Sequence, residues 1–267
     1  MSSVARATPS TLVRRLVVLV AMIFSVVVGQ GQVALGWGQS AAEFAADSDA
    51  TLRVAGYAFA IWGVIYLGLL VYAVRQLRSL KGEGPLIQRF GWPSALAFIG
   101  IGLWIVAAAL DAEVATILLI FGALTVLLIP LLQNATAIRD LPAGDRDRWT
   151  VVWPLSLLAG WLTVAAPLNL ITIATGNGDL PTILAPTVWA MTAVVGVVLV
   201  ALGVTQRIRT IAYALPIAWG LLGAYVAEQP RNAPLAYVAL GAAVAVLVGA
   251  IILVLRRRKG VERPVVA

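Results

Sequence analysis

Cysteine and histidine are both absent from the 267-residue sequence. Without cysteine the chain has no disulfide and no thiolate nucleophile, and without histidine it has no imidazole base that titrates near neutral pH. These two residue types are also the usual protein ligands of zinc and other soft transition metals. We therefore expect no metal site and no cofactor, and we assign no catalytic residue.

Charged residues are scarce as well. They make up 12% of the chain, whereas hydrophobic residues make up 61% and the mean hydropathy is +0.96. Soluble domains are about one-quarter charged and about half apolar. The composition therefore indicates an integral membrane protein whose main partner is the lipid bilayer.

Long apolar blocks give the number of membrane spans. A helix needs about 20 mostly apolar residues to cross a hydrocarbon core about 30 Å thick. Eight such blocks occur, at about 15–36, 55–75, 91–110, 114–135, 150–175, 183–204, 210–227 and 235–255. None has the strand-length alternation of a membrane β-barrel. The sequence thus predicts an all-α, polytopic transmembrane helix bundle of about eight spans.

Lysine and arginine are distributed unevenly between the loops. If both termini are cytoplasmic, all but two of the 19 basic residues lie in cytoplasmic segments, and only Arg53 and Arg231 lie outside. Cytoplasmic loops collect basic residues in this way. We therefore expect a multi-pass protein of a bacterial cytoplasmic membrane with both termini inside. Anionic lipid beside the basic loops accounts for the net charge of +7, so we expect no nucleic-acid partner.

Two segments near the predicted outer face carry further information. The first apolar block continues past Gln30 and Gln32 to Trp37, which favours a retained spanning helix over a cleaved signal peptide. The outside segment 37–54 mixes acidic and apolar residues. We expect it to form a short helix that lies over the mouth of the bundle.

Small residues recur in the last three predicted spans, as Gly196 and Gly203, Gly220 and Gly223, and Gly241 and Gly249. Small side chains let helix backbones approach closely in lipid, where packing drives helix association. We interpret these glycines as helix-packing positions.

The second predicted span carries a stripe of aromatic rings. Phe59, Trp62 and Tyr66 fall at positions i, i+3 and i+7, which places them on one face of a helix with 3.6 residues per turn. Tyr57 lies nearer the outer boundary, where amphipathic rings anchor a helix at the membrane interface. Spacing alone leaves two interpretations of the stripe open, namely interhelical packing and the wall of a ligand pocket.

The fifth predicted span has a second informative face. Trp161, Ala165, Leu168 and Asn169 share it, and Pro167 interrupts the helical hydrogen bonds beside it. An amide side chain inside a span is costly without a partner, so Asn169 should face the interior of the bundle. It can form an interhelical hydrogen bond there, or make a polar contact inside an apolar pocket, and the two roles are compatible.

These two stretches resemble a known family. FAIWGVIY, Phe59 to Tyr66, looks like the second-helix aromatic segment of the tryptophan-rich sensory protein family, also called TspO or translocator protein. WLTVAAPLN, Trp161 to Asn169, is similar to the fifth-helix motif of that family. The resemblance covers roughly residues 12–176, with both motifs in the right order and on the right helices.

The sequence also departs from the family pattern. Residues 54–56 replace the paired prolines that precede the second-helix segment, and Pro154 lies a turn earlier than the proline-tyrosine of the fifth helix. The asparagine-tryptophan pair of the third helix is represented at best by Trp92 or Trp104. The spans at 183–255 have no counterpart in the short family members, so the chain looks like a longer, divergent branch.

The resemblance divides the chain into two parts. Residues 1–176 would form the TspO-like five-helix membrane core. Residues 177–267 would add three transmembrane helices and a basic cytoplasmic tail, whose run Arg256 to Lys259 we interpret as a lipid-headgroup anchor.

What the resemblance implies is a membrane receptor or sensor with an aromatic-lined pocket inside the bundle. Family ligands include tetrapyrroles and other hydrophobic molecules, so the implied partner is a small hydrophobic ligand such as a porphyrin. A second copy of the chain, in a homodimer, is a further candidate partner. The implied ligand-binding residues are Trp62, Tyr66, Trp161 and Asn169, followed by Phe59 and Trp104.

Two other functions compete with the receptor. A small secondary transporter of a hydrophobic or amphipathic solute is compatible with eight spans and several proline-containing helices. Against it, no acidic or basic residue lies deep in a predicted span, where an ion or proton relay is normally placed. An enzyme lacks a usable acid/base pair as well as histidine and cysteine, so we expect the protein not to be an enzyme.

Overall fold

The computed structural model describes residues 9–46, 51–78 and 84–256, and the predicted basic tail beyond Arg256 lies outside this part of the chain. All regular structure in these residues is helical. In chain order the elements are α1 (Pro9–Leu35), α2 (Ala41–Ala46), the 3₁₀ turn η1 (Gly56–Ala60), α3 (Ile61–Arg78), α4 (Pro85–Ala109), α5 (Glu113–Gln133), α6 (Ala135–Asp140), the π-turn η2 (Arg148–Val152), α7 (Trp153–Gly176), α8 (Pro186–Ile208), α9 (Ile211–Glu228) and α10 (Ala233–Leu255).

Eight of these helices are long and apolar enough to cross a membrane, which confirms the predicted number of spans. They are α1, α3 with η1, α4, α5, α7 with η2, α8, α9 and α10. Two helices begin earlier than predicted: α1 begins at Pro9 and not near residue 15, and α4 begins at Pro85 and not near residue 91. Leu86, Ile87 and Phe90 are buried there while Gln88 and Arg89 are exposed, so this first turn and a half is amphipathic and escaped a search for continuous apolar runs.

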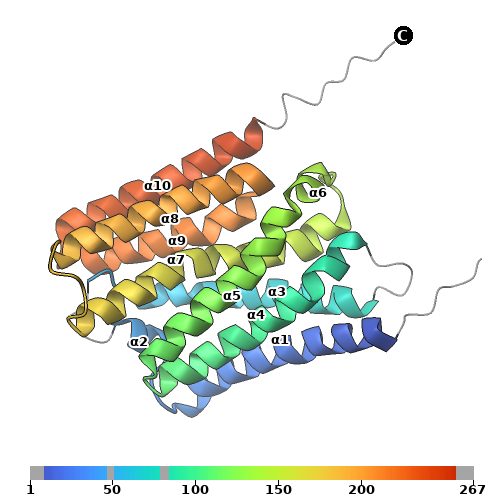
Figure 1. The fold of residues 1–267 in the computed structure, drawn as a ribbon, viewed down its shortest axis with the longest axis horizontal. Helices are drawn as coiled ribbons and strands as arrows, with labels where there is room; N and C mark the ends of the chain where they lie inside the picture. Colours follow the sequence, from blue (N-terminus) through green and yellow to red (C-terminus); the bar gives the residue numbers. More distant parts are fainter. Residues whose placement is uncertain (1–8, 47–50, 79–83, 257–267) are drawn as a thin grey trace, which may run out of the picture.

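The helix α7 lies in the middle of the molecule. Figure 1 shows α8, α9 and α10 along one side of α7 and α1, α4 and α5 along the other. Helices α3, α5, α8 and α9 all pack against α7. A helix that is apolar all round must be covered on all sides by protein or lipid. In α7 most side chains are covered by protein.

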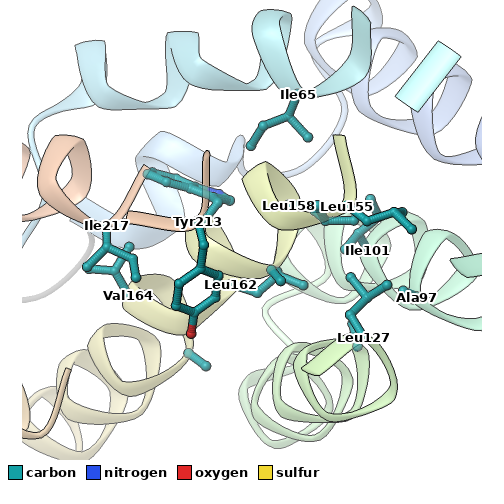
Figure 2. Close-up of a cluster of buried hydrophobic side chains, with 14 of the residues drawn as sticks. Ile65, Ala97, Ile101, Leu127, Leu155, Leu158, Leu162, Val164, Tyr213 and Ile217 are labelled. Atoms are coloured by element: carbon teal, nitrogen blue, oxygen red, sulfur yellow. The ribbon is translucent and has the colours of Figure 1, made fainter. Parts of the chain in front are cut away.

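The core around α7 is built from side chains of five helices. Figure 2 shows Ile65 of α3, Ile101 of α4, Leu127 of α5, Leu158 of α7 and Ile217 of α9 converging there. All five are buried. The last three spans are therefore packed onto the same core as the first five.

The closest helix contact joins α7 to α9 at Gly160. A Cβ atom at Gly160 would overlap the backbone carbonyl oxygen of Tyr213, so only glycine permits this approach. One turn away, the hydroxyls of Thr163 and Tyr213 are 2.7 Å apart and form a buried hydrogen bond. Close backbone approach and an interhelical hydrogen bond are the two main sources of helix association in lipid.

The glycine interpretation is confirmed for some positions and wrong for others. A Cβ at Gly220 would meet Val164 of α7, and a Cβ at Gly223 would meet Ala58 of η1. Around Gly196, Gly203 and Gly241, however, no atom of the described chain lies within 4 Å of the added Cβ. These three glycines lie on outward faces of α8 and α10, which the spacing of glycines cannot distinguish from inward ones.

The contact at Gly160 predicts a contrast between two glycine substitutions. Gly160→Ala should lower the midpoint of thermal unfolding in detergent, because the overpacked contact costs about 1–3 kcal/mol. Gly203→Ala, at an open helical position, should leave the midpoint unchanged or raise it, because alanine is about 1 kcal/mol better than glycine inside a helix. Equal midpoints for the two variants would contradict the packing assigned to Gly160.

Candidate functional site

A cavity lies between α3, α4, α5, α7 and α9, at the end of the bundle that holds α2. Its lining consists of Phe44, Ala45, Leu52, Val54, Phe59, Trp62, Ile101, Trp104, Ile120, Trp161, Leu162, Val164, Ala165, Leu168, Asn169, Thr172 and Gly220. We call this space the aromatic cavity. None of the described residues of this lining is acidic or basic.

The aromatic cavity is narrow. The space between its side chains has a volume of about 760 Å³ when the open mouth is included. The centres of water molecules can occupy only about 60 Å³ of that space. One water needs roughly 10–15 Å³ on that second measure. The present shape therefore has room for a compact molecule of one or two rings, and a larger ligand has to widen it.

Two aromatic side chains of the predicted stripe, Phe59 and Trp62, meet Trp161 of the fifth span at one wall of the aromatic cavity. The ring centroids of Phe59 and Trp161 are 6.0 Å apart and those of Trp62 and Trp161 are 6.3 Å apart, both edge to face. Edge-to-face pairs at this distance are favourable. The aromatic stripe of the second span therefore contacts the fifth span at Trp161.

Tyr66 occupies a different place from the other predicted residues. Its ring stacks against that of Trp62, with centroids 5.2 Å apart, but it does not line the aromatic cavity. The Tyr66 hydroxyl donates a hydrogen bond to the carbonyl of Ser25 in α1 at 3.3 Å. Tyr66 therefore packs behind Trp62. The residues that border the cavity are Phe59, Trp62, Trp104, Trp161 and Asn169.

Asn169 combines the two roles that the sequence left open. Its side-chain nitrogen Nδ2 donates to Thr116 Oγ1 of α5 at 3.1 Å, which confirms that the amide faces the bundle interior and joins two helices. Asn169 also lines the aromatic cavity. Trp104 adds a second polar atom, Nε1, which is covered by its neighbours and has no acceptor among the described residues.

The helix α2 closes the cavity at one end, as predicted for the outside segment. Ser40 and Glu43 form a capping box that starts this helix, with Ser40 N donating to Glu43 Oε2 at 2.8 Å and Glu43 N donating to Ser40 Oγ at 3.2 Å. The backbone hydrogen bond from Ser40 holds the pKa of Glu43 below its usual value. Phe44, the buried residue of α2, packs edge to face on Trp104 at 6.1 Å.

The segment after α2 contains a strained residue, Leu52, and we call α2 and Leu52 together the cap of the cavity. Leu52 is fully buried, lines the aromatic cavity and has φ of 72°, a backbone conformation that is rare for a bulky side chain. Hydrogen bonds hold the chain on both sides of it. Thr51 N donates to Thr175 Oγ1 at 3.2 Å, and Arg53 N donates to Glu228 Oε1 at 2.7 Å.

The seventh span, α9, contributes to the site in a way that the sequence did not reveal. Gly220 lines the cavity, Trp219 Nε1 donates to the carbonyl of Ala58 at 2.9 Å, and Ala55 N donates to the carbonyl of Gly223 at 3.0 Å. These bonds attach η1 and the chain before it to α9. No local motif predicts such a contact, because it joins residues far apart in the sequence. The start of α2, by contrast, could have been predicted from the capping-box spacing of Ser40 and Glu43.

Comparison with protein families gives one finding of broad extent. A family model described as TSPO-like protein matches residues 13–252. The match begins in α1 and ends in α10, so it includes the last three spans. No curated protein and no solved structure matches the chain.

Removing the buried ring of Phe44 should loosen α2 without affecting the rest of the bundle. Phe44→Ala should speed amide hydrogen exchange across Ala41–Ala46 by about tenfold or more, because the ring that holds α2 on Trp104 is lost and local opening costs less. Exchange in the centres of the spans should not change.

Leu35→Ala is the control, because Leu35 is 78% exposed at the nearby end of α1. Its exchange in α2 should equal that of the wild type. Unchanged protection of α2 in Phe44→Ala would mean that Phe44 does not hold the cap.

Proposed function

The chain belongs to the TSPO-like protein family, and on that basis we propose that it is a membrane receptor or sensor that binds a small hydrophobic ligand in the aromatic cavity. The observation that carries the proposal is the lining. Three ring systems, from Phe59, Trp62 and Trp161, meet beside an uncharged space, and one amide side chain faces it. Ligand sites are typically apolar pockets with a few placed polar groups of this kind.

The ligand class that family resemblance suggests is a tetrapyrrole or a similar flat hydrophobic molecule. With no histidine in the chain, a porphyrin would be held by ring contacts and not by imidazole ligation of a metal. A tetrapyrrole is larger than the present cavity, so its binding requires the cap of α2 and Leu52 to move outward. Binding, and not catalysis, is the activity we infer, because the described lining residues include no acid/base pair.

The positions of the charged groups favour a receptor over an ion-coupled transporter. In the described spans the charged side chains lie near helix ends, as with Arg75 of α3, Glu113 of α5 and Glu228 of α9. Transporters driven by ions or protons usually bind them near the middle of the membrane. Uptake of solute into proteoliposomes that responded to a pH or sodium gradient would reverse this ranking.

The protein is a multi-pass integral membrane protein, and three further assignments are proposals that rest on the sequence. We place it in a bacterial cytoplasmic membrane with both termini inside, because the basic residues collect on that side. The division into a core at 1–176 and an addition at 177–267 is a proposal, although α9 reaches the cavity of the core. Association into a homodimer also stays a prediction.

Porphyrin binding tests the proposed function. Protoporphyrin titrated into the detergent-purified protein should quench tryptophan fluorescence saturably. Trp161→Ala should raise the dissociation constant about tenfold or more, because a buried tryptophan that contacts a ligand commonly contributes at least this much.

Trp92→Ala is the matched control, since it also removes one tryptophan but at a half-exposed position of α4 outside the lining. Its dissociation constant should equal that of the wild type. Quenching that does not saturate, and is the same in all three proteins, would contradict the proposal.

A further inference from the structure

The amide of Asn169 is held in one orientation by a chain of two hydrogen bonds. Thr116 Oγ1 donates to the backbone carbonyl of Glu113 at 2.6 Å, and Asn169 Nδ2 donates to Thr116 Oγ1 at 3.1 Å. A hydroxyl has one proton to donate. Because two oxygens 2.6 Å apart would repel each other without a proton between them, the proton of Thr116 lies toward Glu113.

It follows that Thr116 can only accept from the amide. The NH₂ group of Asn169 must therefore face Thr116, and its carbonyl oxygen Oδ1 must face away from it. Thr116 is fully buried, so water cannot replace either bond. The two hydrogen bonds thus determine that the amide oxygen, and not the NH₂ group, is available to a further partner.

The oxygen Oδ1 of Asn169 has no hydrogen-bond partner among the described residues, and the side chain borders the aromatic cavity. The other unpartnered polar atom of the lining, Trp104 Nε1, is covered by neighbouring side chains and does not reach free space. Among the described lining residues, Asn169 Oδ1 is thus the side-chain acceptor without a partner, since the Thr172 hydroxyl already donates to the carbonyl of Leu52 at 3.5 Å. An acceptor left unmet in an apolar site costs free energy that a donor on the ligand would recover.

Resting on the proposed function, we propose that the part of the ligand inside the cavity is uncharged and mostly apolar, that it carries an O–H or N–H group, and that this group donates to Asn169 Oδ1. Asn169 then determines specificity, and Thr116 is a positioning residue that keeps the oxygen turned toward the ligand. An ionised group on the ligand would meet no opposite charge among the described lining residues, so we place it at the mouth of the cavity.

Two naphthalene probes test the proposal, because a two-ring molecule suits the narrow cavity. 2-Naphthol carries a hydroxyl donor, whereas 2-methoxynaphthalene has the same rings and oxygen but no donor. Both are uncharged at pH 7. Titration calorimetry on the full-length protein in detergent gives the ratio of their dissociation constants. The dissociation constant of 2-methoxynaphthalene divided by that of 2-naphthol should be about tenfold larger for the wild-type protein than for Asn169→Leu. A difference of this size is expected for a buried neutral hydrogen bond.

The comparison between proteins removes two confounding effects. The probes partition differently into detergent micelles and differ by one methyl group, but both differences are the same for wild type and Asn169→Leu. The same ratio of dissociation constants in both proteins would overturn the inference. If porphyrin still quenched tryptophan fluorescence saturably, the proposed function would survive that result.

Thr116 supplies the test of orientation. Thr116→Val removes the hydroxyl with little change of shape, so the amide can turn over, and the preference for 2-naphthol should fall while 2-methoxynaphthalene binds as well as before or better. Thr116→Ser keeps a hydroxyl and should restore the preference. A loss of affinity for both probes by the same factor in Thr116→Val would indicate a merely structural role and overturn the positioning claim.

Absence of saturable binding of both probes to the wild-type protein would also overturn the inference. The porphyrin titration then decides the proposed function separately, because it depends on the rings of the cavity and not on Asn169.

Discussion

The rest of the structure depends on the burial of α7 between two groups of helices. This helix is apolar on every side, and helices α3, α5, α8 and α9 pack against it. In lipid there is no hydrophobic force between helices, so their association depends on close packing and on hydrogen bonds. The glycine at position 160 supplies the first and the Thr163 to Tyr213 bond supplies the second.

The same arrangement explains why a cavity lies next to so dense a contact. Toward α9, α7 presents Gly160 and Val164, whereas Trp161 makes edge-to-face contacts with Phe59 and Trp62 and borders the cavity. The strained Leu52 and the helix α2 then close the gap from one end. Because α9 holds the chain that follows Leu52 through Glu228 and Gly223, the seventh span helps to shape a site whose other walls come from the second to fifth spans.

The sequence predicted the parts of this account that depend on composition and periodicity. Apolar length gave the eight spans, and the spacing of Phe59, Trp62 and Tyr66 gave one face that does contact Trp161. Periodicity could not separate Tyr66, which turns toward α1, from Trp62, which borders the cavity. Nor could it find Thr116 or place Gly220 in the cavity lining, because both depend on residues of other helices. It also could not distinguish the packed Gly220 from the open Gly203.

The aromatic cavity between α3, α4 and α7, beneath α2, is where we expect a ligand to bind. Its position can be measured directly with a brominated naphthol in crystals of the protein, located by the anomalous scattering of bromine. We expect a bromine peak within the aromatic cavity, in contact with Trp62 and Trp161. Bromine found only on the lipid-facing surfaces of the helices, with the cavity unchanged, would show that this expectation is wrong.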